Sequence, residues 1–152
     1  MAPHASADRG ETLVELLVTI VIMGIAVAAI VGGLMTSIQM SDIHRKQATA
    51  GALARDYAEG LDRYVAGSAA AYVACAVPST YPLTLPAGVA APGGFTPSIT
   101  SVRYWTGTAW TPTCTSDLGL QQVTVQVATG DSRATETSVV VLRKPCGQGS
   151  TC

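Results

Sequence analysis

The sequence predicts an α+β protein, in which a long N-terminal helix that is transmembrane in its first half packs on a small antiparallel β-sheet head. An uncharged run of 26 residues extends from Leu16 to Ser41. No proline occurs between His4 and Val77, whereas seven occur from Pro78 to Pro145. Between Pro112 and Pro145, apolar and polar residues alternate with the period of two that is typical of half-buried strands.

The apolar run is long enough to cross a bilayer. The 20 residues of Leu16–Met35 span about 30 Å as a helix. Eleven of them are Leu, Ile or Val, which together favour insertion by about 3 to 7 kcal/mol. Glu15 is the last charge before the run and lies at its end, where a charge costs less than the roughly 2.5 to 3.5 kcal/mol of the helix centre. Residues 16–35 are therefore predicted to span a membrane.

Two simpler interpretations compete for this segment. Ala26-Val27-Ala28 resembles the cleavage site of a secretory signal peptide, but the residues before the run carry one Arg against three acids, the wrong sign for a signal peptide. The run also continues well past Ala28. In the other interpretation the segment is an ordinary anchor, and Glu15 merely ends the span at the lipid headgroups.

The residues from Gly10 to Leu16, GETLVEL, resemble the processing site of type IV prepilins and type II secretion pseudopilins. In that family a dedicated membrane peptidase cuts after the glycine that ends a short polar leader. The new N-terminus is usually methylated, and a glutamate five residues into the mature chain precedes an apolar helix. The resemblance implies cleavage between Gly10 and Glu11, N-methylation of Glu11 and an assembly role for Glu15.

This resemblance extends from Arg9 to about Ala54, and Gly24 matches a glycine common in the family's helix. The chain departs from the family at two positions. Glu11 stands where the first mature residue is usually Phe, a change that favours a minor subunit over the main one. Gly32 stands where the family often has proline.

The resemblance also implies a mechanism and a set of partners. Cleavage creates an α-amine four residues from Glu15, and an amine relieves the cost of a carboxylate in a low-dielectric bundle. Glu15 of an incoming subunit then pairs with the N-terminus of an assembled one and sets the axial register. The implied partners are other pilin or pseudopilin subunits, the prepilin peptidase, the inner-membrane assembly platform and membrane lipid.

The implied location is the cytoplasmic membrane, as a single-pass protein with the head outside, followed by an extracytoplasmic or cell-surface filament. The positive-inside rule alone favours the opposite orientation, because His44-Arg45-Lys46 outnumbers the single Arg9. The cleavage motif favours the head outside, because the peptidase acts on the cytoplasmic side.

The helix is predicted to continue beyond the membrane to Ala66, with Gly67 as its stop. Leu53, Tyr57, Leu61 and Val65 recur every four residues and form a stripe expected to pack under the head. The expected organisation is a leader over residues 1–10, a long helix over 11–66 and a β-rich head over 67–152.

The head sequence predicts two pairs of strands. Val123, Val125 and Val127 alternate with polar residues in one strand, which the polar loop Thr129–Glu136 joins to a second strand at Thr137–Arg143. A hairpin is predicted from Ile99–Thr106 and Ala109–Thr113.

Gly107-Thr108 fits the turn of that hairpin and sets Trp105 opposite Trp110, either as a packed cross-strand pair or as an exposed binding platform. Pro78–Pro97 is predicted to be an irregular connection.

Four cysteines in an exported head predict disulfides. A metal site is not expected, because there is no CxxC motif and neither histidine falls in the head. Three pairings are possible. The C-terminal sequence CGQGSTC favours a small Cys146–Cys152 loop, which leaves Cys75–Cys114 to tie the segment after the helix to the sheet.

Composition and site chemistry limit the function classes. A net charge of −1 and a pI of about 6 give no evident basic footprint for nucleic acid. The head acids Asp117, Asp131 and Glu136 are expected to be scattered through loops, without a histidine base or a phosphate-binding loop, so neither an enzyme nor a cofactor is predicted. The sequence predicts a structural subunit, a minor pilin or pseudopilin. The alternative is a single-pass, membrane-anchored β-domain that binds a surface ligand without polymerising.

Overall fold

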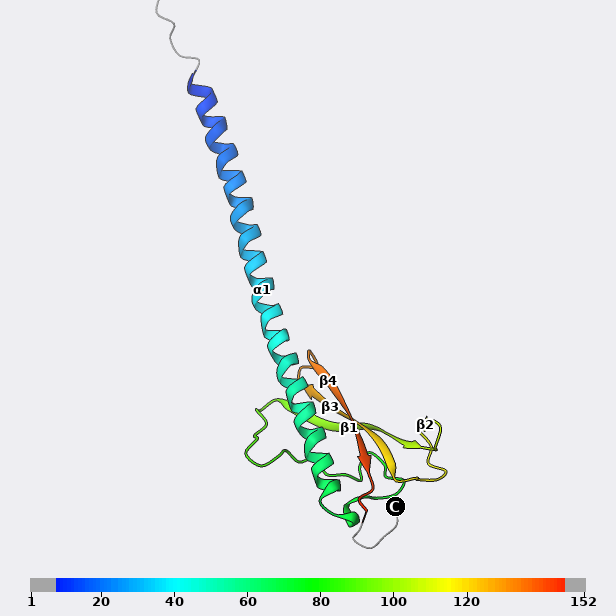
Figure 1. The fold of residues 1–152 in the computed structure, drawn as a ribbon. Coiled ribbons are helices and arrows are strands. Elements are labelled where there is room, and N and C mark those ends of the chain that lie inside the picture. The colour runs from blue at the N-terminus through cyan, green and yellow to red at the C-terminus, as the bar shows by residue number, and fades with distance from the viewer. Residues whose placement is uncertain (1–7, 147–152) are drawn as a thin grey trace, which may run out of the picture. The chain divides into compact units, whose positions relative to one another are not determined.

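The computed structural model describes residues 8–146, with side chains from Leu13 onward. Two compact units divide the chain between Asp42 and Ile43. The elements follow the predicted order of a long helix and then strands (Figure 1). They are α1 (Asp8–Ala66), the short 3₁₀ helix η1 (Ala69–Ala71), β1 (Phe95–Trp105), β2 (Trp110–Thr111), β3 (Leu120–Thr129) and β4 (Thr135–Arg143).

Helix α1 begins at Asp8, three residues before the predicted start at residue 11. Gly10 does not stop it, because one glycine costs only about 1 kcal/mol relative to alanine and no proline lies nearby. The glycines Gly32 and Gly33 also lie within the helix.

The first unit exposes its apolar side chains, including Ile20 and Ile30, which are each 62% exposed. By length and composition, the helix qualifies as a membrane span, with a mean hydropathy of 2.7 in its most apolar window.

Within the second unit, α1 supplies one side of the core. Leu53, Tyr57, Leu61 and Val65 are all buried, which confirms the predicted stripe. Ala50, Ala54 and Ala58 are buried beside them and bring the helix close to its neighbours. The helix ends as predicted, and the Gly67 N–H donates to the Arg63 carbonyl at 2.9 Å.

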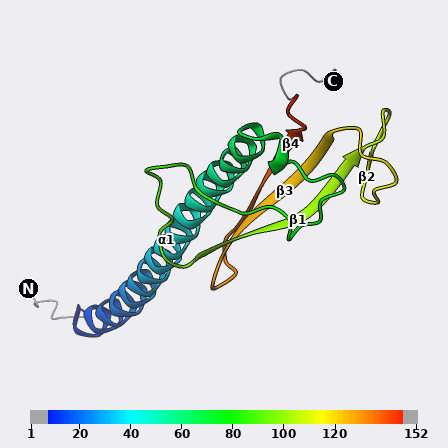
Figure 2. The ribbon, with the colours of Figure 1, turned by 90° about the horizontal axis from the view of Figure 1, so that it is seen from below.

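The head sheet is antiparallel, with the strand order β2-β1-β3-β4. Its central strand β3 alternates strictly, so that Val123, Val125 and Val127 are fully buried while Gln122 and Thr124 are half-buried. Figures 1 and 2 show the C-terminal part of α1 alongside this sheet. The predicted fold class is confirmed: one long helix and a four-stranded antiparallel sheet.

The strand boundaries differ from prediction in three places. β1 begins at Phe95, so Pro97 lies in a strand and not in the irregular connection. β1 has no neighbour other than β3 at Pro97, and an edge position tolerates the missing N–H. β2 is only two residues long, because Pro112 cannot continue the ladder.

β4 begins at Thr135, because its ladder with β3 extends as far as Ala128↔Thr135. Glu136 therefore lies in a strand and not in the predicted loop.

Gly60 marks a close approach that sequence reasoning missed. A Cβ at this position would lie 2.2 Å from the carbonyl oxygen of Thr84. The segment around Thr84 therefore packs directly on the helix backbone, with Leu83 and Leu85 beside the core. The connection from Pro78 to Gly94 lacks helix and strand, but it forms part of the packed head.

Candidate assembly site and the bracing of the head

Glu15 lies on α1, with exposed leucines at the two following positions. The Thr19 hydroxyl donates to the Glu15 backbone carbonyl at 2.7 Å and leaves the carboxylate untouched. Within residues 13–146, no side chain forms a hydrogen bond or ion pair with this carboxylate. Among the described side chains, Glu15 is thus an unpaired acid at the start of an apolar helix surface.

Gly10 and Glu11 lie near the N-terminal end of α1. Glu11 precedes Glu15 by four residues, which corresponds to about 6 Å along the helix axis. The Glu11 side chain lies outside the described side chains. The backbone thus carries the predicted processing position and the predicted assembly residue on one short stretch of helix.

The surface beyond Glu15 is uncharged as far as Ser41 and mainly apolar around the helix. Leu16, Leu17 and Val18 are three consecutive exposed residues, and consecutive residues point about 100° apart. A Cβ added at Gly24 or Gly32 would meet no atom within 4 Å. A helix that is apolar all round requires an apolar environment, either lipid or other helices.

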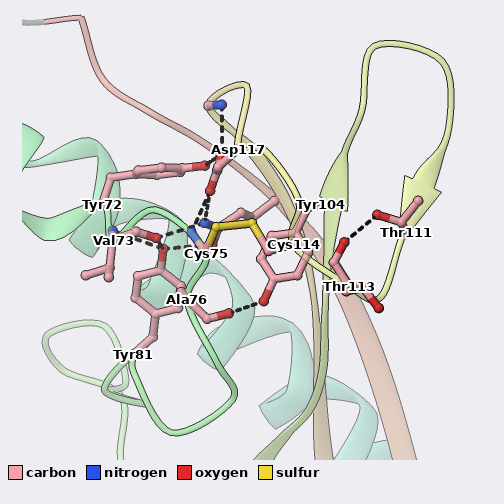
Figure 3. Close-up of a disulfide and its surroundings, with 12 residues drawn as sticks. Tyr72, Val73, Cys75, Ala76, Tyr81, Tyr104, Thr111, Thr113, Cys114 and Asp117 are labelled. Atoms are coloured by element: carbon pink, nitrogen blue, oxygen red, sulfur yellow. Dashed lines mark hydrogen bonds between the residues drawn. A yellow bond between two sulfur atoms is a disulfide. The ribbon is translucent and has the colours of Figure 1, made fainter.

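A disulfide joins Cys75 to Cys114, with a Cα–Cα distance of 5.6 Å (Figure 3). It ties the segment after α1 to the loop after β2, which confirms the predicted pairing. Cys75 adopts a φ of +56°, which is uncommon for a residue other than glycine. Cys146 is also disulfide-bonded, and its predicted partner Cys152 lies outside the described residues.

Asp117 braces the same segment. Its carboxylate accepts hydrogen bonds from the Tyr72 hydroxyl at 2.7 Å, the Cys75 N–H at 2.9 Å and the Gly119 N–H at 2.8 Å (Figure 3). The Gln121 amide donates to it at 2.6 Å. Partial burial alone would raise the pKa of Asp117, but these four donors outweigh it and lower the pKa below its ordinary value.

Two tyrosines extend this polar network into the core. The Tyr81 hydroxyl donates to the fully buried Gln121 at 2.9 Å, and the Tyr104 hydroxyl donates to the Ala76 carbonyl at 2.6 Å. Burial raises the pKa of Tyr81. Burial also raises the pKa of Tyr72 well above its usual range, and the bond to Asp117 adds to this shift. The network therefore keeps Tyr72 and Tyr81 neutral beside the ionised Asp117.

Asp131 fixes the opposite end of the sheet to α1. Its carboxylate pairs with the Lys46 ammonium at 2.8 Å and accepts a hydrogen bond from the Thr129 hydroxyl at 2.6 Å. The bonds from Lys46, Thr129 and the Arg133 N–H hold the pKa of Asp131 well below its usual range. The pair joins the helix to the β3–β4 turn within the second unit.

These bracing roles were not predicted. Asp117 and Asp131 were expected to be scattered loop acids, and both are structural hydrogen-bond acceptors. Nothing in the local sequence indicated their partners. Tyr72 is 45 residues away from Asp117, and Lys46 is 85 residues away from Asp131. Within residues 8–146, no group of three or more His, Cys, Asp and Glu side chains could hold a metal ion.

Comparison with known proteins adds one finding at the other end of the chain. Residues 5–31 match the family model described as the prokaryotic N-terminal methylation motif. No curated protein and no solved structure matches the chain significantly. The matched segment contains Gly10, Glu11 and Glu15, and it precedes a head with a four-stranded antiparallel sheet. The methylation motif, the apolar helix and this head together support membership of the type IV pilin and pseudopilin family, a family of structural subunits and not of enzymes.

Proposed function

We propose that the chain is a minor pilin or pseudopilin of a type IV pilus-like or type II secretion filament, cut by prepilin peptidase after Gly10. Subunits then associate through the apolar part of α1 and through Glu15. The observation that carries this proposal is the Glu15 carboxylate, which is unpaired among the described side chains and lies beside an exposed, uncharged and mainly apolar helix surface.

The physical argument rests on the cost of an isolated charge. When apolar helices bundle, the Glu15 carboxylate leaves water, and an unpaired carboxylate in such surroundings is strongly disfavoured. Cleavage after Gly10 supplies an α-amine at Glu11. Pairing between the amine of one subunit and Glu15 of another removes the penalty only in one axial register, so the charge pair selects the register while the apolar surface supplies the contact area.

The same helix explains how one chain serves two environments. Before assembly, residues 16–35 lie in the cytoplasmic membrane with the head on its extracytoplasmic side. After cleavage, the helix leaves lipid for a bundle of equivalent helices. Gly10 near the end of α1 weakens the helix locally by about 1 kcal/mol, which helps the scissile bond to open into the peptidase.

The test is incorporation into filaments. Glu15→Ala should insert into the membrane and be cleaved normally, because the apolar run carries insertion, but it should be depleted from sheared filament fractions. Thr19→Ala is the matched control, since it lies one helical turn further along and carries no charge, and it should incorporate like the wild type.

Normal incorporation of Glu15→Ala would contradict the register role of Glu15. The double variant Glu11→Ala/Glu15→Ala then shows whether Glu11 has taken over that role. If the wild-type chain remains uncut in the membrane, and Glu15→Ala and Thr19→Ala behave in the same way, the result would favour the anchored β-domain that does not polymerise.

A further inference from the structure

The sheet face turned away from α1, called the outer face here, carries the side chains that alternate with the buried valines. The ladder register aligns these side chains in rows across the strands. One row is Arg103, Gln122 and Val141, and the next is Ser101, Thr124 and Val139. Trp105 and Trp110 lie at one end of the face, and Arg143 lies beyond Val141 on β4.

Charge is segregated between the two sides of the head. Asp131 pairs with Lys46 of α1, and Glu136 lies against α1 at Gly51. Asp117 binds the segment after the helix. The three head acids are thus engaged away from the outer face, where Arg103 and Arg143 are both exposed. Among the described residues, the outer face is cationic although the whole chain has a net charge of −1.

The tryptophans form a packed but accessible pair. Their ring centroids are 5.3 Å apart with an interplanar angle of 56°, and both side chains are half-buried. This is the predicted cross-strand pair. Arg103 donates from Nη2 to the Trp110 carbonyl at 3.1 Å, which holds the guanidinium beside the hairpin. Aromatic surface and a fixed cation therefore lie next to each other.

We propose that the outer face binds an acidic polysaccharide, a chain of sugar rings that carry carboxylates. Exposed indole surface packs against the C–H faces of pyranose rings. Arg103 and Arg143 pair with the carboxylates, a geometry that suits the planar guanidinium. Gln122, between the two arginines, offers its amide to sugar hydroxyls. Two arginines are few for nucleic acid, whose binding grows with the number of phosphates neutralised.

In a filament this face is available. In the proposed filament the subunits associate through the apolar part of α1, and that contact does not use the outer face of the head. That consequence rests on the proposed function. The binding chemistry rests on the head alone, so binding is tested on the full chain in detergent micelles, where filament assembly plays no part.

The probe is immobilised polygalacturonate, with neutral dextran and single-stranded oligothymidylate as comparators. The wild type should bind polygalacturonate and not dextran, and its affinity should fall as salt rises. Arg103→Gln/Arg143→Gln should weaken binding by about tenfold or more. Arg143→Gln alone, which leaves the bond from Arg103 to Trp110 intact, should weaken it less. Arg55→Gln, the same change on the exposed side of α1, should leave the affinity unchanged.

Three outcomes would overturn the proposal. The first is no binding to polygalacturonate, or equal binding by the double variant and the wild type. The second is tighter binding to oligothymidylate through the same arginines, which would make the outer face a nucleic-acid surface. The third is self-association that the arginine variants abolish, which would identify a second copy as the partner.

Discussion

The two compact units of the chain use the same apolar residue types in opposite ways. Valines and isoleucines of the first unit are exposed, as at Ile20 (62%) and Val21 (52%), whereas Val123, Val125 and Val127 of the head are 0% exposed. The head buries its core valines within its own fold, whereas the apolar side chains of the first unit can be buried only by lipid or by other chains. The comparison shows that the first unit depends on lipid or on other subunits, while the head depends on contacts between distant parts of its own sequence.

The largest expected effect on the stability of the head comes from removing its Cys75–Cys114 disulfide. Cys75→Ser together with Cys114→Ser should lower the free energy of unfolding of the head by about 2 to 4 kcal/mol, because the disulfide closes a loop of about 40 residues. Both tryptophans lie in the head, so denaturant unfolding followed by tryptophan fluorescence measures this unit alone. Membrane insertion should not change. Equal unfolding midpoints for the variant and the wild type would show that the polar network alone holds the segment.

The next effect concerns packing on the helix backbone. Gly60→Ala should destabilise the head by about 1 to 3 kcal/mol, because the new Cβ would lie 2.2 Å from the Thr84 carbonyl oxygen. Gly51→Ala is the matched control. Its Cβ meets only the Glu136 Cγ at 3.8 Å, so it should be neutral or gain up to about 1 kcal/mol from helix propensity. A similar response of both variants would mean that the segment around Thr84 does not pack on α1.

Protonation should weaken the head at low pH. The folded pKa values of Asp117 and Asp131 lie below the ordinary value of 3.8, so their stabilisation is present above about pH 4 and is lost as pH falls through the folded values. Asp117→Asn should cost about 1 to 2 kcal/mol at pH 7 and should flatten the profile below pH 4. Urea midpoints measured between pH 2 and 7 test this. A midpoint that rises with acidification would contradict the assigned sign.

The smallest effect is expected at the end of the chain. Cys152→Ser should be nearly neutral for the stability of the head, because the predicted Cys146–Cys152 loop encloses only a few residues at the terminus. Non-reducing peptide mapping of the wild type should identify this pair. A peptide that joins Cys146 to any other cysteine would show that the predicted pairing is wrong.

The same contrast explains what the sequence could predict. The apolar segment of α1 could be predicted from its uncharged length, and the strand β3 from the alternation of its residues. The Trp105–Trp110 register follows from a two-residue turn. The bracing of the head could not be predicted, because Asp117 depends on Tyr72, 45 residues away. Gly60 resembles any helical glycine until Thr84 is placed beside it. Pro97 suggested a loop, because proline is tolerated in a strand only where no neighbour needs its N–H. That condition depends on the order of the strands in the sheet, which the local sequence does not reveal.

The central claim is that the first unit is a prepilin-type segment, and the N-terminus of the mature chain tests it most directly. In cells that contain prepilin peptidase, mass spectrometry should find a chain that begins at Glu11, with or without an N-methyl group. Gly10→Val should leave the chain uncut. A mature chain that begins near Ala29 would establish a secretory signal peptide and contradict the account, as would a wild-type chain that keeps its first ten residues.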